Sequence, residues 1–517
     1  MKSLAALFLV LSILPARAAT LNRGNGAEPD SLDPYHVGGT WEENIVGDML
    51  IGLTTLDAAA RPIPGMAERW EVSKDGLTWT FHLRQALWSD GVPVTADDFV
   101  FAWRRLLDPK TASRYAYNMW VVKNARAVSE GRLPPEKLGV TAKNPRTLIV
   151  TLAHPAPYLP ELLSHVTADP LPRHALARDR DWAKPGHYRA NGPYLLKAWL
   201  PNDHITLVKN PRFYDAAHVR IDTVNYFPTA DSNAALRRFR AGELDMQTPI
   251  PSSQVGWMRT HLPKALHILP SLAIDYIAFN LDYPPLKDVR IRRALNLVYD
   301  REAMAGKVLK LGEKPAYRYV PPGTAHYPGQ AAMDFNAMPY PARVALARRL
   351  MQDAGYGPFN RLHLIYATTN APDRRRTAAV FQAMARRIYI DLEIAGTDPQ
   401  VHLRNLRLGQ FQLGASSWLA DFNDASNFLD LLRSDAGNNY AHYRNPNFDA
   451  LMNRAQNEPD TAKRAALMLA AEKRAMADYP WLVTRFLSQS EAVSPRVGGY
   501  IPNVRDFNRT RWLWIRK

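Results

Sequence analysis

Cysteine is absent from all 517 residues of the chain. This absence excludes disulfide bonds, a thiolate nucleophile and cysteine ligands for a metal. It also excludes a lipid-modified cysteine after a cleaved leader. The fold must therefore be held by packing and hydrogen bonds, without covalent cross-links.

Long apolar runs are also missing, apart from Leu4 to Leu14. That run is too short for a membrane-spanning helix, which needs about twenty residues. It follows a basic start at Lys2 and precedes the small residues Ala16 and Ala18. The pattern predicts a signal peptide over residues 1–18, and an exported protein that does not span a membrane and diffuses freely in the periplasm of a Gram-negative cell.

Recognisable catalytic motifs are missing as well. The chain has no His-Glu-x-x-His zinc motif and no Gly-x-Ser-x-Gly nucleophile elbow, and His363 and His402 lack a partner at metal-binding spacing. We expect no enzymatic activity, no cofactor and no metal. A secreted hydrolase stays open as the alternative from a different class, and would need a nucleophile, a base and oxyanion donors in one cleft.

The charge is strongly basic, with 65 Lys and Arg against 49 Asp and Glu, a net charge of +16. Such a balance can indicate a polyanionic partner, but the arginines are spread along the chain. The densest clusters are Arg374 to Arg376 and the group around Arg237. We interpret these clusters as solvated helix faces, or alternatively as binders of acidic ligand groups, and expect no nucleic-acid partner.

The residues that are present indicate a large mixed fold. The length suggests two to four domains, at roughly 150 residues each. Residues 194–208, 77–83 and 147–152 alternate as strands do, whereas 97–107 and 462–477 show helical spacing. Thr95 with Asp98, and Asp288, are placed to cap helix starts. The pattern predicts an α/β or α+β architecture.

Several sequence blocks carry a more specific signal. They are residues 26–34, 67–84, 88–100, 191–194, 210–214, 288–295 and 497–500. These blocks resemble, in order, the signature regions of the bacterial peptide/nickel solute-binding family, the receptors of ABC importers. The resemblance covers the chain from about residue 21 to the end. The segments 108–115 and 418–423 look most like oligopeptide and murein-peptide receptors, and dipeptide, nickel and haem receptors match less well.

The resemblance implies an α/β fold of the periplasmic-binding-protein type. Two discontinuous lobes would be joined by a hinge, with an extra domain inserted in the first. Carried onto this chain, lobe I would comprise residues 19–44, 166–271 and 486–517. The extra domain, lobe II, would be 45–165, and lobe III would be 272–485.

The resemblance also implies a site for an extended peptide bound by strand addition. One flanking strand would be Gly38, Gly39 and Thr40, and the other residues 416–419 with Ser417, Trp418 and Leu419. An ordinary loop at the two glycines, and core packing for Trp418, stay open. Tyr115 would donate its hydroxyl to the ligand backbone.

Asp421 is the predicted anchor of the ligand's amino terminus, because a buried carboxylate forms a charge-assisted hydrogen bond with an ammonium group. Since Phe422, Asn423 and Asp424 follow, Asp421 could instead cap the next helix.

The chain departs from the family pattern at both ends of this site. Two positions that form a disulfide in some relatives are occupied here by Ala273 and Leu419, so both cysteines of that pair are replaced. Where some relatives place an arginine for the ligand's carboxylate, this chain has Ala415. Arg404 and Arg407, three apart on one helix face, are candidate replacements, as is the triplet 374–376. The extra positive charge would favour an acidic ligand such as a murein tripeptide.

The sequence therefore predicts a periplasmic receptor of an ABC importer that closes two lobes over an oligopeptide. We expect it to be a monomer that delivers the ligand to inner-membrane permease subunits. A receptor for peptidoglycan-derived peptides is the alternative within this class.

Overall fold

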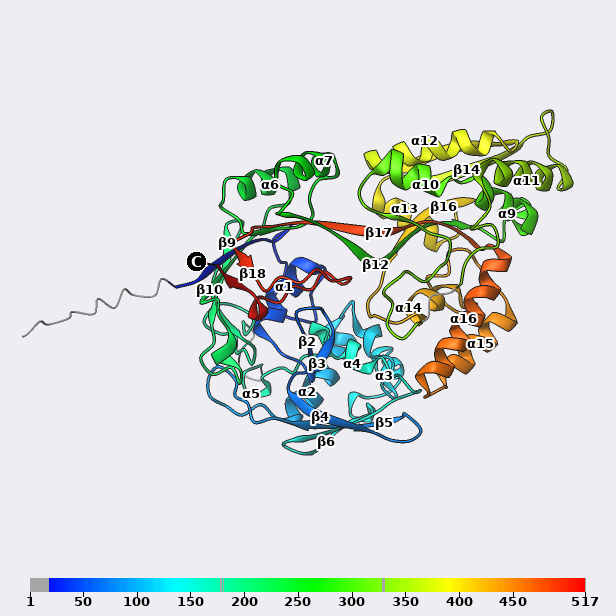
Figure 1. The fold of residues 1–517 in the computed structure, drawn as a ribbon. Coiled ribbons are helices and arrows are strands. Elements are labelled where there is room, and N and C mark those ends of the chain that lie inside the picture. Colours follow the sequence, from blue (N-terminus) through cyan, green and yellow to red (C-terminus); the bar gives the residue numbers. More distant parts are fainter. Residues whose placement is uncertain (1–17, 177–178, 180, 328–330, 517) are drawn as a thin grey trace, which may run out of the picture.

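The computed structural model describes residues 18–176, 179, 181–327 and 331–516. Residues 1–17 of the predicted signal peptide lie outside the described residues. The fold is mixed α/β and is built on an 11-stranded sheet (Figure 1). Its strands are, from edge to edge, β15 (Ile390–Thr397), β14 (Leu362–Thr369), β16 (Leu413–Leu419), β12 (Leu266–Phe279), β17 (Trp481–Val493), β11 (Met246–Gln247), β1 (Thr20–Gly24), β10 (Thr223–Phe227), β9 (His204–Lys209) and β8 (Tyr194–Leu200), with β13 (Lys314–Pro315) added to β17.

Strands β12 and β17 connect the two ends of this sheet. They are 14 and 13 residues long and run antiparallel, with Leu266 opposite Ala492 and Ala278 opposite Trp481. Their register shifts between Pro270 and Ile274. Figure 1 shows them crossing from the part that holds β8 to β10 to the part that holds α9 to α13. These two strands are thus a continuous link between the halves.

Strand directions are mixed within the sheet. β14 lies parallel to β15 and β16, and β1 lies parallel to β10 and β11, whereas β8, β9 and β10 form an antiparallel meander. The strand pattern predicted over residues 194–208 is confirmed as the β8–β9 hairpin.

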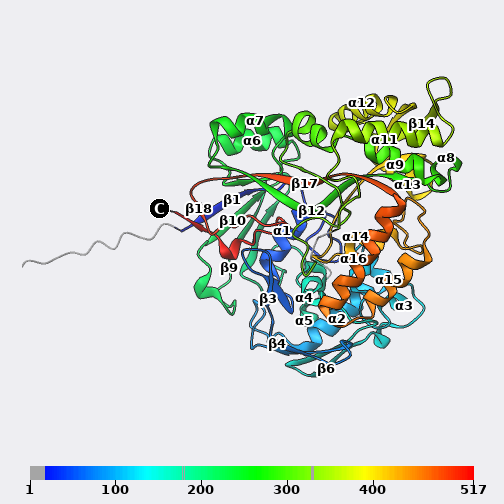
Figure 2. The same cartoon turned by 45° about the vertical axis from the view of Figure 1, so that its right-hand side comes forward.

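Helices surround both ends of the sheet (Figures 1 and 2). α6 (Ser232–Arg240) and α7 (Ser252–His261) lie beside each other at one end. The other end carries α8 (Pro284–Lys287), α9 (Val289–Val298), α10 (Arg301–Ala303), α11 (Tyr340–Asp353), α12 (Pro372–Arg386), α13 (Pro399–Arg407), α14 (Ser426–Leu429), α15 (Pro446–Gln456) and α16 (Thr461–Asp478). The helix predicted over 462–477 is confirmed as α16, and Asp288 caps α9 through the amide of Arg290 at 2.8 Å.

A smaller antiparallel sheet lies at the base of the molecule. Its order is β4 (Ala67–Val72), β5 (Thr78–Leu83), β7 (Thr147–Thr151) and β6 (Val140–Asn144). β5 and β7 match the alternating patterns predicted there. Helix α2 (Ala96–Leu107) begins with the predicted capping box, because the Thr95 amide donates to Asp98 at 2.8 Å. The remaining elements of this half are α1 (Thr40–Met49), β2 (Thr54–Leu56), β3 (Pro62–Pro64), α3 (Ala125–Ser129), α4 (Leu159–Leu162) and α5 (Arg173–Leu176).

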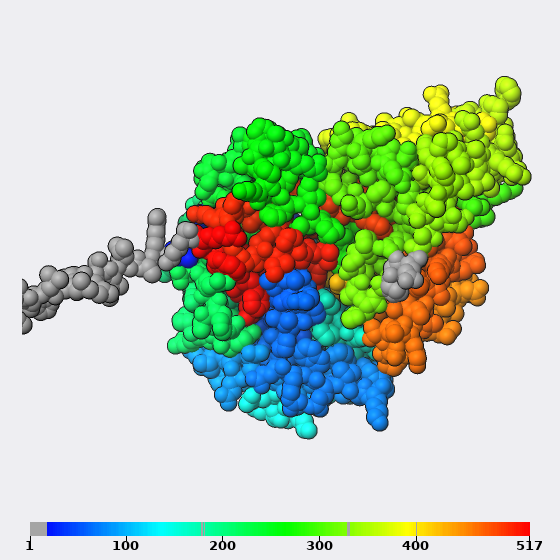
Figure 3. All heavy atoms as spheres, in the orientation of Figure 1, coloured from blue at the N-terminus to red at the C-terminus, as the bar shows by residue number. Residues whose placement is uncertain are grey.

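Two large hydrophobic cores divide the chain. One is made of buried residues between Leu272 and Phe486. The other combines residues between Leu21 and Tyr226 with late ones such as Val493 and Leu513. The C-terminal segment, which includes β18 (Val497–Gly498) and β19 (Trp514–Ile515), therefore returns to the N-terminal core. Figure 3 shows residues of this segment at the surface beside the N-terminal part of the chain.

Candidate functional site

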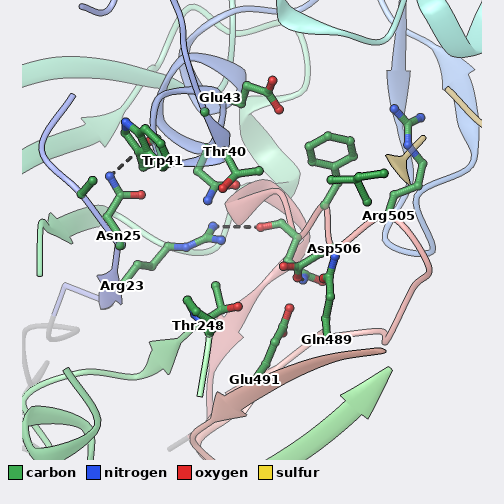
Figure 4. A pocket seen from close by; sticks show the side chains of 18 of the residues that line it. Arg23, Asn25, Thr40, Trp41, Glu43, Thr248, Gln489, Glu491, Arg505 and Asp506 are labelled. Atoms are coloured by element: carbon green, nitrogen blue, oxygen red, sulfur yellow. Dashed lines mark hydrogen bonds between the residues drawn. The ribbon is translucent and has the colours of Figure 1, made fainter. Parts of the chain in front are cut away.

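A cavity of about 560 Å³ lies where the two halves of the large sheet meet. Its walls come from five segments that are distant in sequence: 23–27, 38–41, 246–249, 419–421 and 504–508. Strand β17 adds Gln489 and Glu491, and Tyr115 and His165 come from the smaller half. Figure 4 shows side chains from several of these segments facing a common space. The volume is in the range of ligand sites of other proteins.

Six of the predicted site residues line this cavity. They are Gly38, Gly39, Thr40, Tyr115, Leu419 and Asp421. The structure therefore brings together segments that the sequence separates by almost four hundred positions. Ser417, Trp418, Arg404 and Arg407 do not line the cavity, and their contact with a ligand stays a prediction.

The strand expected at Gly38, Gly39 and Thr40 is wrong. Helix α1 begins at Thr40, and the two glycines form the irregular approach to it. The physical reason is Glu42, a fully buried residue whose carboxylate accepts from the amides of Gly38 and Gly39, each at 2.8 Å, and from that of Asp30 at 3.1 Å. These two glycine amides are thus paired within the protein and cannot pair with an added strand.

The strand predicted at residues 416–419 is confirmed as the end of β16. Leu419 faces the cavity and is opposite Ala273 in β12, so the two positions lost from the family disulfide are direct strand neighbours. Trp418 packs partly against the core of residues 272–486, and its indole N–H donates to Asn427 at 2.7 Å. Ser417 is exposed.

Asp421 lies just after β16 and presents its carboxylate to the cavity. Burial raises the pKa of Asp421, although His165 and hydrogen bonds from Tyr117 and Asn427 favour the charged form. The alternative that Asp421 caps the next helix is not what the structure shows. Asp424 instead accepts from the amide of Ser426, at 2.9 Å, where α14 begins.

A second acid, Glu43 on α1, faces the same space. Its carboxylate lies 3.1 Å from Nε2 of His165, whose ring is 5.3 Å from that of Tyr115. Although burial opposes it, the charges of His165 and Arg509 lower the pKa of Glu43. Burial raises the pKa of Tyr115 to about 12, so this residue keeps its hydroxyl proton and can donate it. Sequence analysis missed Glu43 and His165 because neither belongs to a local motif.

The arginines proposed for the ligand's carboxylate lie elsewhere. Arg404 and Arg407 are exposed on α13. Arg374 of the triplet ion-pairs with the buried Asp275 at 2.6 Å. Ala415 is buried, and its carbonyl accepts from His402 at 2.7 Å. The interpretation of the triplet as a solvated helix face is wrong for Arg374, because its side chain is largely buried against Asp275.

Two arginines do line the cavity, and both are engaged by the protein. Arg23 donates to the carbonyl of Asn508 at 2.8 Å and to the Thr510 hydroxyl at 2.9 Å. Arg505 donates to Glu161 at 2.6 Å. The lining carboxylates are Glu43, Asp421, Glu491 and Asp506. The cavity is therefore acidic although the whole chain is basic.

Two further features are missing from the part of the chain that the structure describes. No helix there combines the length and apolar character needed to cross a membrane. Nor do its His, Asp and Glu side chains gather in groups of three or more that could hold a metal ion.

Solved structures with this architecture include periplasmic binding proteins. The unliganded open form of the murein tripeptide-binding protein MppA has a TM-score of 0.87 and 32% identity, covering 97% of this chain and 98% of its own. OppA of Haemophilus influenzae, in complex with RPPGFSPFR, has a TM-score of 0.79 and 31% identity, covering 97% and 99%. The fold is that of a periplasmic binding protein, as predicted.

Sequence comparisons define the family within that class. The model of the bacterial extracellular solute-binding proteins, family 5, matches residues 61–440. The probable deoxycholate-binding periplasmic protein YgiS of Escherichia coli is 37% identical, covering 95% of this chain and 92% of its own. The periplasmic oligopeptide-binding protein OppA of Escherichia coli is 35% identical, covering 97% and 93%. The chain belongs to the family 5 solute-binding proteins.

Proposed function

We propose that this protein is the periplasmic receptor of an ABC importer and binds oligopeptides in extended form. The observation that supports this proposal best is the position of Asp421, a cavity carboxylate at the end of β16. The backbone of an extended ligand can form hydrogen bonds with the end of this strand. The ammonium group of the ligand can then form an ion pair with the Asp421 carboxylate. Two relatives described above bind oligopeptides, according to their names.

Ligand binding would close two lobes over the cavity. We assign residues 19–44, 166–271 and 486–517 to lobe I, 45–165 to the inserted lobe II, and 272–485 to lobe III. The division is supported by the core between Leu272 and Phe486, which is separate from the core around Leu21. The lobes would pivot about β12 and β17, and the likeness to an open form suits the unliganded state.

The relatives suggest two other ligands, a bile acid and a murein tripeptide. Deoxycholate and murein tripeptides are anions, whereas the lining acids of this cavity outnumber its arginines, which are already paired. A buried anion beside these carboxylates is costly because like charges repel in a low-dielectric site. The charge balance favours an oligopeptide with a free amino terminus. The likeness to MppA keeps murein peptides as the second candidate.

The setting of this receptor follows from the same proposal. It would act as a monomer, pass peptide to inner-membrane permease subunits, and reach the periplasm through a cleavable signal peptide at residues 1–18. No cysteine in the chain could carry a lipid anchor.

Native mass spectrometry of the protein purified from its own periplasm tests the function. A ladder of peptide masses is expected for an oligopeptide receptor. A single mass that contains diaminopimelate would instead identify a murein-peptide receptor. A bound bile acid, or the failure of every peptide to bind in calorimetry, would contradict the proposal.

A further inference from the structure

Strand β17 presents two polar side chains, Gln489 and Glu491, on the face that lines the cavity. They are two residues apart, so they project from the same side of the strand. Glu491 is only 2% exposed. One of its oxygens accepts from the Tyr500 hydroxyl at 2.8 Å, and the other, Oε1, has no hydrogen-bond partner within the protein. Figure 4 shows Glu491 and Gln489 facing the space shared with Thr248.

Two side-chain amides in the cavity wall share this arrangement. Gln247 donates its N–H to the carbonyl of Thr248 at 3.3 Å, and Gln489 donates to the Ser271 hydroxyl at 3.4 Å. In each amide the oxygen is buried and has no partner within the protein. Gln247 is 2% exposed and lies over Gly24, where a Cβ atom would stand 2.0 Å from its oxygen. The glycine therefore leaves room for this acceptor.

This wall holds three buried oxygens without a donor, one each on Glu491, Gln489 and Gln247. A buried acceptor without a partner costs stability, which a ligand that brings donors can recover. Ammonium and guanidinium groups carry donors and no acceptors, so they match such a wall. An ionised carboxylate brings no donor to these three oxygens.

Among the described residues, no lysine, arginine or histidine side chain forms an ion pair with Glu491. Arg23, the cation whose charge acts on it, donates to Asn508 and Thr510 instead. Burial raises the pKa of Glu491 to about 7, in keeping with a carboxylate that lacks an ion-pair partner.

We propose that Glu491, Gln489 and Gln247 form a second subsite, which takes a positively charged side chain of the bound peptide, lysine or arginine. This inference rests on the proposed function. Asp421, from the other half of the sheet, would hold the amino terminus, so that a preferred ligand carries two positive charges. The subsite makes the receptor selective for basic peptides, in contrast to the acidic ligand suggested by the net charge of the chain.

Calorimetry with a set of synthetic peptides tests the subsite. The probes are tetra-alanine and its variants in which each alanine in turn is replaced by lysine or by the apolar norleucine. At one of the four peptide positions, we expect the wild-type protein to bind the lysine variant at least about tenfold more tightly than the norleucine variant at pH 8. Glu491→Gln, which keeps the shape and removes the charge, should reduce that ratio to near one.

Matched variants separate the subsite from general charge effects. Glu136→Gln removes the same charge from an exposed residue that does not line the cavity, and should keep the wild-type ratio. Gln489→Met removes one neutral acceptor and should lower the ratio by a smaller factor. If Glu491→Gln does not fold, as judged by circular dichroism, Gln489→Met carries the test.

The outcomes distinguish the two proposals. Binding of tetra-alanine by the wild-type protein without a lysine preference at any position would overturn the subsite and leave the proposed function standing. An unchanged ratio in the folded Glu491→Gln variant would overturn the assignment to Glu491. Failure of every peptide to bind would overturn both the subsite and the function.

Discussion

Two buried carboxylates in one cavity, Asp421 and Glu491, differ in how visible they are in the sequence. Asp421 follows a tryptophan in a family motif, so it could be predicted as a ligand anchor. Glu491 belongs to an ordinary strand pattern, and its importance comes from a missing partner, which only three-dimensional packing reveals. A motif can therefore identify a ligand anchor such as Asp421, whereas a buried oxygen without a hydrogen-bond partner, as on Glu491, is found only in the structure.

Replacing Asp421 by asparagine should weaken the binding of peptides that have a free amino terminus. Loss of one member of a buried ion pair costs about 3 to 5 kcal/mol, so the dissociation constant should rise by at least about a hundredfold. Calorimetry with tetra-alanine measures the change. Asp435→Asn, at an exposed site with 84% of the side chain accessible, is the control and should bind like the wild-type protein. Equal affinity of Asp421→Asn and the wild-type protein would remove Asp421 from the site.

The preference for lysine should depend on pH through Glu491. Because burial raises its pKa to about 7, the carboxylate is protonated in acid and charged above neutrality. The ratio of lysine to norleucine affinity should therefore fall as the pH is lowered from 8 to 6. The neighbouring groups are Arg23, Tyr500 and His267, which is opposite Glu491 in β12 and whose own pKa burial lowers. Burial and the charge of Glu491 raise the pKa of Tyr500, so its hydroxyl keeps its proton over this range.

The raised pKa of Glu491 also affects the stability of the unliganded protein, but in the opposite direction: lysine preference rises with pH, whereas stability falls. The folded state holds a proton on Glu491 at pH values where the unfolded chain, with the ordinary glutamate pKa of 4.5, has released it. The contribution of Glu491 to stability is therefore largest in acid and is lost as the pH rises through 4.5 to 7. In chemical denaturation, the free energy of unfolding of Glu491→Gln should lack the decrease between pH 4.5 and 7 that Glu491 causes. A pH profile identical to that of the wild-type protein would contradict the assigned pKa.

Among the elements, α1 has the greatest effect on the cavity, because Thr40, Trp41 and Glu43 on its first turn all line the wall. Its start is fixed by Glu42, which accepts three backbone amides. The helix therefore sets the position of a cavity wall through a residue that does not line the cavity.

Glu42→Ala should destabilise the protein by about 2 to 4 kcal/mol, since it leaves the amides of Asp30, Gly38 and Gly39 without their acceptor. Urea denaturation followed by tryptophan fluorescence measures the loss. Asp373→Ala is the matched control, because Asp373 is also a first-turn acid but pairs with Arg376 at the surface of α12. If both variants lost the same stability, the buried network around Glu42 would not be the cause.

Elements with a strong local pattern were predictable from the sequence. The hairpin of β8 and β9 alternates throughout, and α2 and α16 combine helical spacing with caps. The glycine segment before α1 was predicted wrongly from its resemblance to a binding strand, because the hydrogen bonds from Gly38 and Gly39 to the buried Glu42 were not foreseen. Arg374 was misread for a different reason. Its partner Asp275 is almost one hundred positions away, and no local pattern reports such a pair.

At the scale of the whole molecule, the two halves share β12 and β17, and the cavity lies where these strands cross between them. The proposed lobe boundaries come from a family resemblance and could not come from periodicity, since segments from both ends of the chain share one hydrophobic core. The cavity itself was predicted in part, through Gly38, Tyr115 and Asp421.

Peptide binding should make the molecule more compact. The structure resembles an open binding protein, and closure would bring the lobes together about β12 and β17. Small-angle X-ray scattering should show a smaller radius of gyration when tetra-lysine is added to the wild-type protein. Asp421→Asn at the same peptide concentration should keep the larger radius. A radius that does not change in the wild-type protein would exclude closure by this peptide.

The return of the C-terminal segment to the first core also determines when the receptor can form. Thr20 pairs with Thr223, and Arg23 reaches Thr510 across 487 positions. Contacts so distant in sequence are closed late, because the entropy cost of a long loop must be met before the contacts stabilise it. The strand that carries Glu491 is among the last to be synthesised. A partly exported chain therefore lacks the part of the cavity wall that β17 supplies, and binding competence should appear only after the final residues have reached the periplasm.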